Sequence, residues 1–126
     1  MKNYEKWFKK AEEDIYTAKL LLKETDSPVC IICFHSQQAA EKYLKAYLVV
    51  RNIDFPKTHD LKILINICLT FNQKFSEIEK ISSRLSEFGT YPRYPDAFDD
   101  IVLSHAQQAF ENAIIIKEFV LKYFFH

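Results

Sequence analysis

The sequence predicts an all-α protein, folded as an antiparallel up-and-down bundle of four to five helices. Three observations support this: the 126 residues include one glycine and four prolines, hydrophobic residues make up 48%, and apolar residues recur every three or four positions. A β-sandwich or barrel needs glycine and proline at its many turns, whereas helices need few. The apolar content excludes intrinsic disorder, and the length fits a single domain over residues 1–126.

Two long helices are expected in the first half of the chain. The first runs from Asn3, a suitable N-cap, to about Glu24. One of its faces carries Trp7, Ala11, Asp14, Ala18 and Leu21. Pro28 follows a turn and suits the first position of a second helix, at 28–51. Because apolar residues surround most of this second helix, we expect it at the centre of the bundle.

The middle of the chain predicts a loop and two shorter helices. Residues 52–57 have the composition of a loop, and Thr58 is the expected N-cap of the helix that follows. Ser76 has the capping-box spacing to Glu79, and Gly89 suits a left-handed helix end, so the next helix is expected at about 76–88.

The last part of the chain predicts a stiff loop followed by one long helix. Residues 90–96 contain two prolines and cannot lie inside a helix. A second capping-box pattern starts at Ser104 and predicts the beginning of the last helix. Residues 97–103 fit either an extension of that helix or a separate turn.

Charge and hydropathy limit the classes of function. Basic and acidic residues both number 17, so contact with a nucleic acid or nucleotide requires a local cluster of cations. No stretch resembles a bilayer-spanning segment of roughly 18 to 20 apolar residues, and the charged N-terminal stretch is not a secretory signal. We therefore expect a cytoplasmic protein that does not bind a membrane.

The three cysteines are expected to be buried, reduced thiols. Cys30 and Cys33 have the spacing of a redox or metal pair, but they lie in the apolar run VCIICF without a second pair. A structural zinc site needs four ligands, and a reactive thiolate needs an electropositive, accessible setting. Cys68 is interpreted in the same way. The sequence also lacks a P-loop and a Rossmann glycine pattern, so neither a metal nor a cofactor is expected.

One polar stripe is expected on the second helix. Its members are spaced i, i+3, i+7 and i+10, which places them within about 80° of arc. They are His35, Gln38, Lys42 and Lys45. Such a stripe offers hydrogen-bond donors and two cations to a phosphate or carboxylate. The alternative is structural, with solvated lysines and a histidine whose hydrogen bonds are satisfied within the core.

Two loops hold the other candidates for a nucleotide- or anion-binding site. Lys57 and His59 precede a helix N-terminus, where free N–H groups favour an anion. Arg93 and Tyr94 lie in TYPRYPD, a proline-stiffened segment suited to clamping a phosphate or stacking on a base. We expect Lys42, Lys57 and Arg93 to converge on one anion-binding pocket lined by His35, His59 and Tyr94. The alternatives are helix capping for the first loop and a surface covering for the second.

Several motifs together resemble the HEPN domain family, over nearly the whole chain. They are Trp7-x3-Ala11-x2-Asp14-x3-Ala18, then FHSQQAAEKYLKA at residues 34–46, then KTHDL at 57–61, then RYP at 93–95. The resemblance implies a helical bundle that commonly forms a homodimer. It also implies a nucleotide- or RNA-interacting protein that acts beside a small nucleotidyltransferase, as its substrate-binding or toxin–antitoxin partner.

Many HEPN proteins are metal-independent ribonucleases that use an Arg followed, after four to six residues, by His. Here the nearest pair is Arg51 and His59, with seven residues between them. This departure favours a protein that is not an enzyme, with no catalytic residue assigned. One alternative is a ribonuclease toxin with an atypical site built from His59, His35 and Arg93. The other is a purely structural adaptor.

Overall fold

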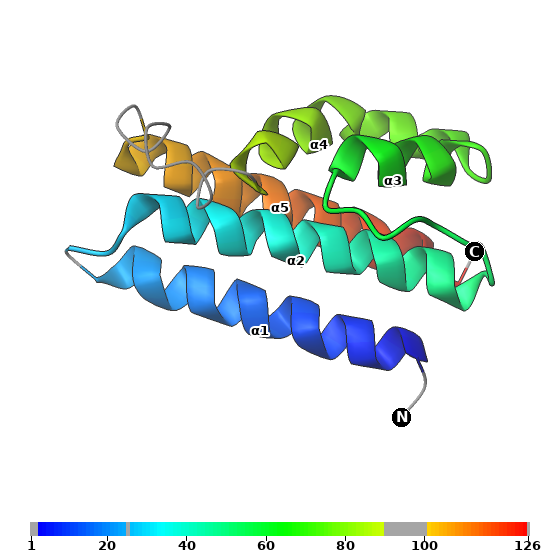
Figure 1. Ribbon diagram of the computed structural model, residues 1–126, viewed down its shortest axis with the longest axis horizontal. Coiled ribbons are helices and arrows are strands. Elements are labelled where there is room, and N and C mark those ends of the chain that lie inside the picture. The colour runs from blue at the N-terminus through cyan, green and yellow to red at the C-terminus, as the bar shows by residue number, and fades with distance from the viewer. Residues whose placement is uncertain (1–2, 25, 90–100, 126) are drawn as a thin grey trace.

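The computed structural model describes residues 3–24, 26–89 and 101–125. Within these ranges the chain forms five α-helices and two 3-10 segments, which confirms the all-α bundle. The long helices are α1 (Asn3–Lys23), α2 (Val29–Val50) and α5 (Leu103–Tyr123). The shorter elements are α3 (Leu61–Leu69), η1 (Gln73–Ile78), α4 (Glu79–Ser86) and η2 (Glu87–Gly89). Figure 1 shows α1 antiparallel to α2, with α3 and α4 on the other side of α2.

The central position of α2 is confirmed. Thirteen of its 22 residues are buried, because α1, α3, α4 and α5 all pack against it. Close approach is helped by alanines, which are fully buried at Ala11 and Ala18 of α1, at Ala39 of α2 and at Ala109 of α5. Small side chains of this kind let two helix axes come near one another.

The ends of α2 differ slightly from the expected ones. Pro28 is the N-cap, in an extended conformation with φ −68° and ψ 113°, and not the first helical residue. At the other end Asn52 has a φ of 56°, a left-handed value that asparagine tolerates better than most residues. The N–H of Ile53 then donates to the carbonyl of Leu48 at 3.0 Å, which closes the helix with a Schellman-type bond.

The segment from Asn52 to Asp60 does not simply reverse the chain. It runs back along α2 before α3 begins, so that α3 lies beside α2 rather than beyond its end (Figure 1). As a consequence His59 lies beside the middle of α2. This path is what brings the KTHDL motif to the FHSQQAAEKYLKA string of α2.

Two predicted helix caps are wrong. The N-cap of α3 is Asp60, whose Oδ1 accepts from the N–H of Lys62 at 2.9 Å, while the Thr58 hydroxyl accepts from the N–H of Asp60 at 3.0 Å. The hydroxyl of Ser86 favours Asp60 over Thr58 as the N-cap. It donates to Asp60 Oδ1 at 3.1 Å and accepts from the N–H of Leu61 at 3.0 Å. Such a long-range contact is invisible to local sequence patterns.

The helix expected at 76–88 divides into three elements. Asn72, not Ser76, caps the 3-10 segment η1, and its Oδ1 accepts from the N–H of Lys74 at 3.0 Å. The helix α4 itself starts at Glu79. Gly89 ends η2, and no glycine of the described chain has a positive φ, so the left-handed helix end predicted there is wrong.

The last helix begins one residue before the predicted capping box. Val102 is the N-cap, and its N–H donates to Nδ1 of His105 at 3.0 Å. The sequence leaves the conformation of residues 97–103 open. Residues 101 and 102 are not helical, and Leu103 is the first residue of α5. Residues 97–100 lie outside the described residues. None of the described helices is both long and apolar enough to traverse a bilayer.

An aromatic core and an arginine clamp join α2 to the end of α5. Phe75 is fully buried, with its ring 4.6 Å from that of Tyr47 and 4.9 Å from that of Phe119. The guanidinium of Arg51 lies 3.8 Å from the centre of the Tyr47 ring. Its Nη1 and Nη2 donate to the carbonyls of Phe124 and Tyr123, both at 2.8 Å. Arg51 therefore satisfies carbonyls that the end of a helix leaves without intrahelical partners.

The cysteine prediction holds for two of the three thiols. Cys33 and Cys68 are buried, and burial raises the pKa of each thiol to about 12. Cys30 is only half-buried, so the prediction that it is buried is wrong. It lies in the first turn of α2, where fewer neighbouring helices can cover it.

Candidate functional site

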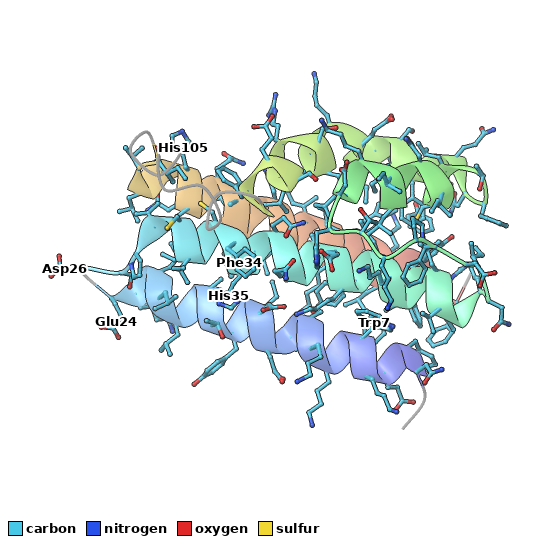
Figure 2. The ribbon with its side chains drawn as sticks, viewed as in Figure 1. Trp7, Glu24, Asp26, Phe34, His35 and His105 are labelled. Atoms are coloured by element: carbon cyan, nitrogen blue, oxygen red, sulfur yellow. The ribbon has the colours of Figure 1, made fainter. Side chains whose placement is uncertain are left out.

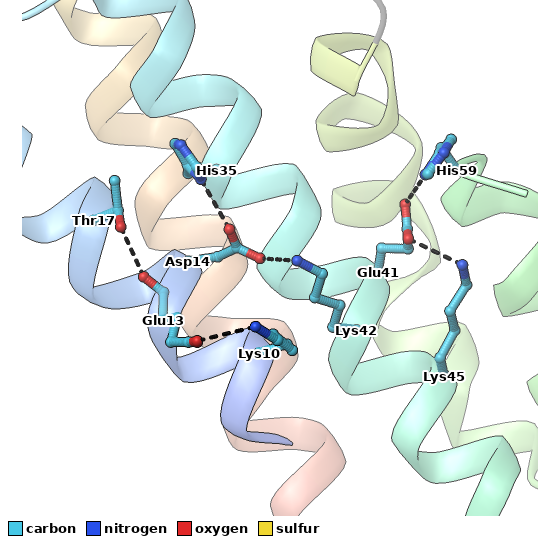
Figure 3. Close-up of polar contacts among 9 residues, drawn as sticks. All are labelled: Lys10, Glu13, Asp14, Thr17, His35, Glu41, Lys42, Lys45 and His59. Carbon is cyan, nitrogen blue, oxygen red and sulfur yellow. Dashed lines mark hydrogen bonds and ion pairs between the residues drawn. The ribbon is translucent and has the colours of Figure 1, made fainter. Parts of the chain in front are cut away.

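The first polar cluster joins α1 to α2 through one carboxylate. Asp14 is 7% exposed, and its Oδ1 accepts from Nδ1 of His35 at 2.8 Å. Its Oδ2 accepts from Nζ of Lys42 at 2.5 Å. Figure 2 shows His35 at the junction of the two helices, and Figure 3 shows Asp14 between its two partners. Because a carboxylate only accepts, the His35 nitrogen that faces it carries the hydrogen.

The second polar cluster lies on the other side of α2 and has the same chemistry. Glu41 is 2% exposed, with Nζ of Lys45 at 3.0 Å from Oε2 and Nδ1 of His59 at 2.9 Å from Oε1 (Figure 3). The backbone of His59 is held as well, because Nε2 of Gln37 donates to its carbonyl at 2.8 Å. The His59 side chain is nevertheless 56% exposed. One ring nitrogen is thus anchored while the imidazole faces solvent.

Lys45 is buried beneath two aromatic rings. Its side chain is 8% exposed, and Nζ lies 5.4 Å from the centre of the Trp7 ring and 5.8 Å from that of Phe55. The two rings also contact each other edge to face, at 6.5 Å between centroids. Aromatic faces attract a cation, and together with Glu41 they replace the water that Lys45 loses on burial.

A third contact ties α1 to α5 but involves none of the predicted site residues. Oε1 of Glu12 accepts from Nζ of Lys117 at 2.8 Å and also from the hydroxyl of Tyr43. Desolvation works to raise the pKa of Glu12, but the hydrogen bonds from Lys117 and Tyr43 outweigh it, and the pKa is lowered. Burial, followed by the Glu12 contact, raises the pKa of Tyr43. This contact is structural, because it fixes one helix against another.

Four of the described site candidates lie in two clusters, each built on its own carboxylate. His35 and Lys42 contact Asp14, whereas Lys45 and His59 contact Glu41. Gln38 is half-buried on α2 and Lys57 is exposed before α3. Arg93 and Tyr94 lie outside the described residues, so their part in the predicted pocket stays a prediction.

Sequence reasoning misses the acceptors at the centre of both clusters. It places Asp14 on the buried face of α1 but without a partner, and it gives Glu41 and Gln37 no role. A signal exists: Asp14 is a carboxylate on an otherwise apolar helix face, and such a group needs a cation or hydrogen-bond donors. Across the described residues, no three His, Cys, Asp or Glu side chains are grouped so that they could hold a metal ion.

The protein is thus an all-α helical bundle in which a buried carboxylate on each side of the central helix holds one histidine and one lysine. Comparison with known families then gives the family: the HEPN domain matches residues 4–123, and the chain belongs to the HEPN domain family.

Three known proteins are similar to this chain. The "Putative toxin MJ1304" of Methanocaldococcus jannaschii is 34% identical over 102 residues, which are 75% of this chain and 66% of the relative, slightly less than two thirds of its length. The crystal structure of ST0689, an archaeal HEPN homologue, superposes with a TM-score of 0.77 at 25% identity, covering 98% of this chain and 99% of that one. TT1696 from Thermus thermophilus has a TM-score of 0.80 at 21% identity, covering 97% and 98%. The last similarity concerns the fold alone.

Proposed function

We propose that this HEPN protein binds a phosphate-bearing ligand, a nucleotide or RNA, and acts in a toxin–antitoxin type system as the partner or substrate-binding subunit of a small nucleotidyltransferase. The observation that supports ligand binding is the presentation of His59. Glu41 holds one ring nitrogen and Gln37 holds the backbone carbonyl, while the side chain remains 56% exposed. An exposed imidazole fixed in this way is pre-organised for a ligand.

The exposed lysine beside His59 supplies the expected charge. Lys57 lies two residues before it and has an exposed side chain. A phosphate held by Lys57, together with Arg93, which lies outside the described residues, would make charge-assisted hydrogen bonds of roughly 1.5 to 3 kcal/mol each. Tyr94 would offer a ring for base stacking. In this proposal His35, Gln38 and Lys42 form a second polar surface along α1 and α2.

Isothermal titration with AMP, ADP, ATP and a short single-stranded RNA tests this function. We expect one of these ligands to bind, and the His59→Ala and Lys57→Ala variants to bind it about tenfold more weakly. Lys80→Ala is the matched control, because Lys80 is an exposed lysine on α4. Absence of binding to all four ligands would instead support the structural adaptor.

The partnership with a nucleotidyltransferase has its own test. The toxin relation rests on the family and on the name of the M. jannaschii relative, which the chain covers only in part. Coexpression with the nucleotidyltransferase encoded nearest to this protein should give a complex that survives size-exclusion chromatography. Two separate peaks at micromolar concentration would contradict the partnership.

We further propose that the chain acts as a homodimer. The helix α5 exposes Ile115 and Leu121, which are 42% and 47% accessible in one chain. Apolar side chains on an outer helix face are suited to a two-fold helix-packing interface. Sedimentation equilibrium should give twice the 14.9 kDa mass of the chain, and a monomer at high micromolar concentration would contradict it.

A metal-independent ribonuclease is the second candidate, favoured by the Glu41–His59 pair. A carboxylate that orients a histidine through Nδ1 leaves Nε2 to exchange a proton with a reacting hydroxyl. Arg51, however, is committed to the carbonyls of Phe124 and Tyr123. In this candidate function Arg93 supplies the cation and His35 assists. Cleavage of RNA in the presence of EDTA, and growth arrest on expression, should both be lost in His59→Ala if this candidate is right.

A further inference from the structure

Two lysines expected to contact a ligand are instead paired with carboxylates inside the protein. Lys45 is 8% exposed at the side chain, and its Nζ lies on Glu41 and behind Trp7 and Phe55. Lys42 is 21% exposed and its Nζ lies on Asp14. A ligand would have to compete with a largely buried carboxylate for either ammonium, and drawing the ammonium away would be costly because the carboxylate would lose its counter-ion.

Each lysine shares its carboxylate with one histidine. In the Glu41 cluster Lys45 is on Oε2 and His59 on Oε1; in the Asp14 cluster Lys42 is on Oδ2 and His35 on Oδ1. A buried carboxylate requires a positive charge nearby. Since the lysine supplies it, the histidine can act as an oriented hydrogen-bonding group.

We propose that Lys45 is a positioning residue for His59, acting through Glu41, and that Lys42 has the same role for His35 through Asp14. The biological role of this positioning rests on the proposed function, whereas the positioning itself can be tested in the ligand-free protein. It replaces direct ligand contact by both lysines, and leaves the exposed Lys57 as the described cation available to a ligand beside His59.

The surroundings of His59 support a dominant role for Lys45. Glu41 contacts both His59 and Lys45 of α2, and the segment that carries His59 also holds Lys57 and Asp60. Asp60 is engaged by the Ser86 hydroxyl of α4 and by the N–H of Lys62. Lys57 is exposed, so water screens its charge. Lys45 is therefore the lysine that contacts Glu41 directly, at 3.0 Å.

Nitrogen NMR of the histidine rings in the ligand-free protein tests the proposal. At a pH of about 7.5, both His35 and His59 should carry a hydrogen on Nδ1, because that nitrogen faces a carboxylate oxygen. His105 should carry it on Nε2, because its Nδ1 accepts from the N–H of Val102. In Lys45→Met the buried charge of Glu41 needs a new counter-ion. We expect the ring-nitrogen signals of His59 to depart from the wild-type Nδ1–H pattern, with those of His35 unchanged.

The reciprocal variant is the control. Lys42→Met should change His35 in the same direction and leave His59 unchanged, whereas Lys45→Arg should restore the normal His59 spectrum because it keeps the charge. If Lys45→Met leaves His59 as it was, or if Lys42→Met changes His59 equally, the proposal is wrong. Should Lys45→Met fail to fold, Glu41→Gln must shift His59 away from the Nδ1–H form, and Lys45→Arg must preserve that form.

A titration with AMP separates this proposal from the proposed function. We expect Lys45→Met to weaken AMP binding severalfold, because His59 is no longer held in position through Glu41. Lys45→Arg should recover the binding, because it keeps the charge and Lys45 does not touch the ligand. If the wild-type protein binds no AMP while the ring spectra behave as described, the positioning role stands and the nucleotide function falls. If the binding is unaffected by Lys45→Met although the His59 ring spectrum changes, His59 does not contact the ligand, and the assignment of Lys45 as a positioning residue for binding is overturned.

Discussion

Replacing Arg51 by alanine should destabilise the bundle without touching the candidate site. The guanidinium makes two 2.8 Å hydrogen bonds to the carbonyls of Phe124 and Tyr123, and stacks 3.8 Å from the centre of the Tyr47 ring. Charge-assisted hydrogen bonds contribute roughly 1.5 to 3 kcal/mol each when buried, but Arg51 is only half-buried. We therefore expect a loss of about 2 to 3 kcal/mol in all, including ~0.5 kcal/mol from the stacking.

Urea denaturation followed by circular dichroism measures this loss. In thermal denaturation of this 126-residue chain, the same loss of stability should lower the Tm by roughly 6 to 15 °C. Amide hydrogen exchange should accelerate most in the last turn of α5, where the two carbonyls lose their donors. Arg51→Lys should recover less than half of the loss, because an ammonium cannot bind two carbonyls and lie flat on a ring at once.

The same variant decides whether Arg51 and His59 form a catalytic pair. Arg51→Ala should leave ligand binding by the folded protein within about twofold of wild type, since its side chain is committed to the end of α5. A stable Arg51→Ala protein that has lost nucleotide binding or RNA cleavage would refute this reasoning and return Arg51 to the functional site.

Four further predictions follow from the packing, the thiols and the charges. Ala39→Phe should lower stability by about 1 to 3 kcal/mol in urea denaturation, because Ala39 is fully buried between helices; a wild-type Tm would show spare volume there. A thiol reagent should label Cys30 first in the native protein, with Cys33 and Cys68 protected until unfolding because burial raises their pKa to about 12; equal rates would contradict this. The pKa of Glu12 is lowered on folding, so it contributes stability above its unfolded pKa that is lost as the pH falls through its folded pKa; Glu12→Gln should flatten the acid limb of a stability–pH curve, and an unchanged limb would count against it. Arg93→Ala should weaken AMP or RNA binding about tenfold or more without lowering the Tm, and unchanged binding would remove Arg93 from the proposed site.

The sequence predicts those features of the fold that depend on helical periodicity. The face of α1 that carries Ala11, Asp14 and Ala18 is buried as expected, because the same spacing determines both pattern and packing. Helix ends are predicted less well. Thr58 and Ser76 both match capping patterns, yet Asp60 and Asn72 are the caps. The hydroxyl that favours Asp60 comes from a residue 26 positions away, which local patterns cannot contain.

The candidate site could be predicted by residue type but not by contact. The stripe on α2 includes His35, Lys42 and Lys45, and all three do take part in polar clusters. Their positions on the helix do not show which groups the ends of their side chains contact. Lysine ammonium groups reach toward buried carboxylates, and those carboxylates, Asp14 and Glu41, lie on different sides of α2 (Figure 3). Pairing is decided by the tertiary arrangement of the helices.

Because other helices pack around α2, its interior should not tolerate the insertion or deletion of a residue. Each added residue would rotate everything after it by about 100° and advance it by about 1.5 Å. An insertion between Gln38 and Glu41 would therefore turn Lys42 away from Asp14 and Glu41 away from His59 in one step, although every side chain would still be present. The segment 52–57, which lies outside any helix, has no such constraint. Length variation among functional relatives should accordingly occur in that segment and be absent from the interior of α2.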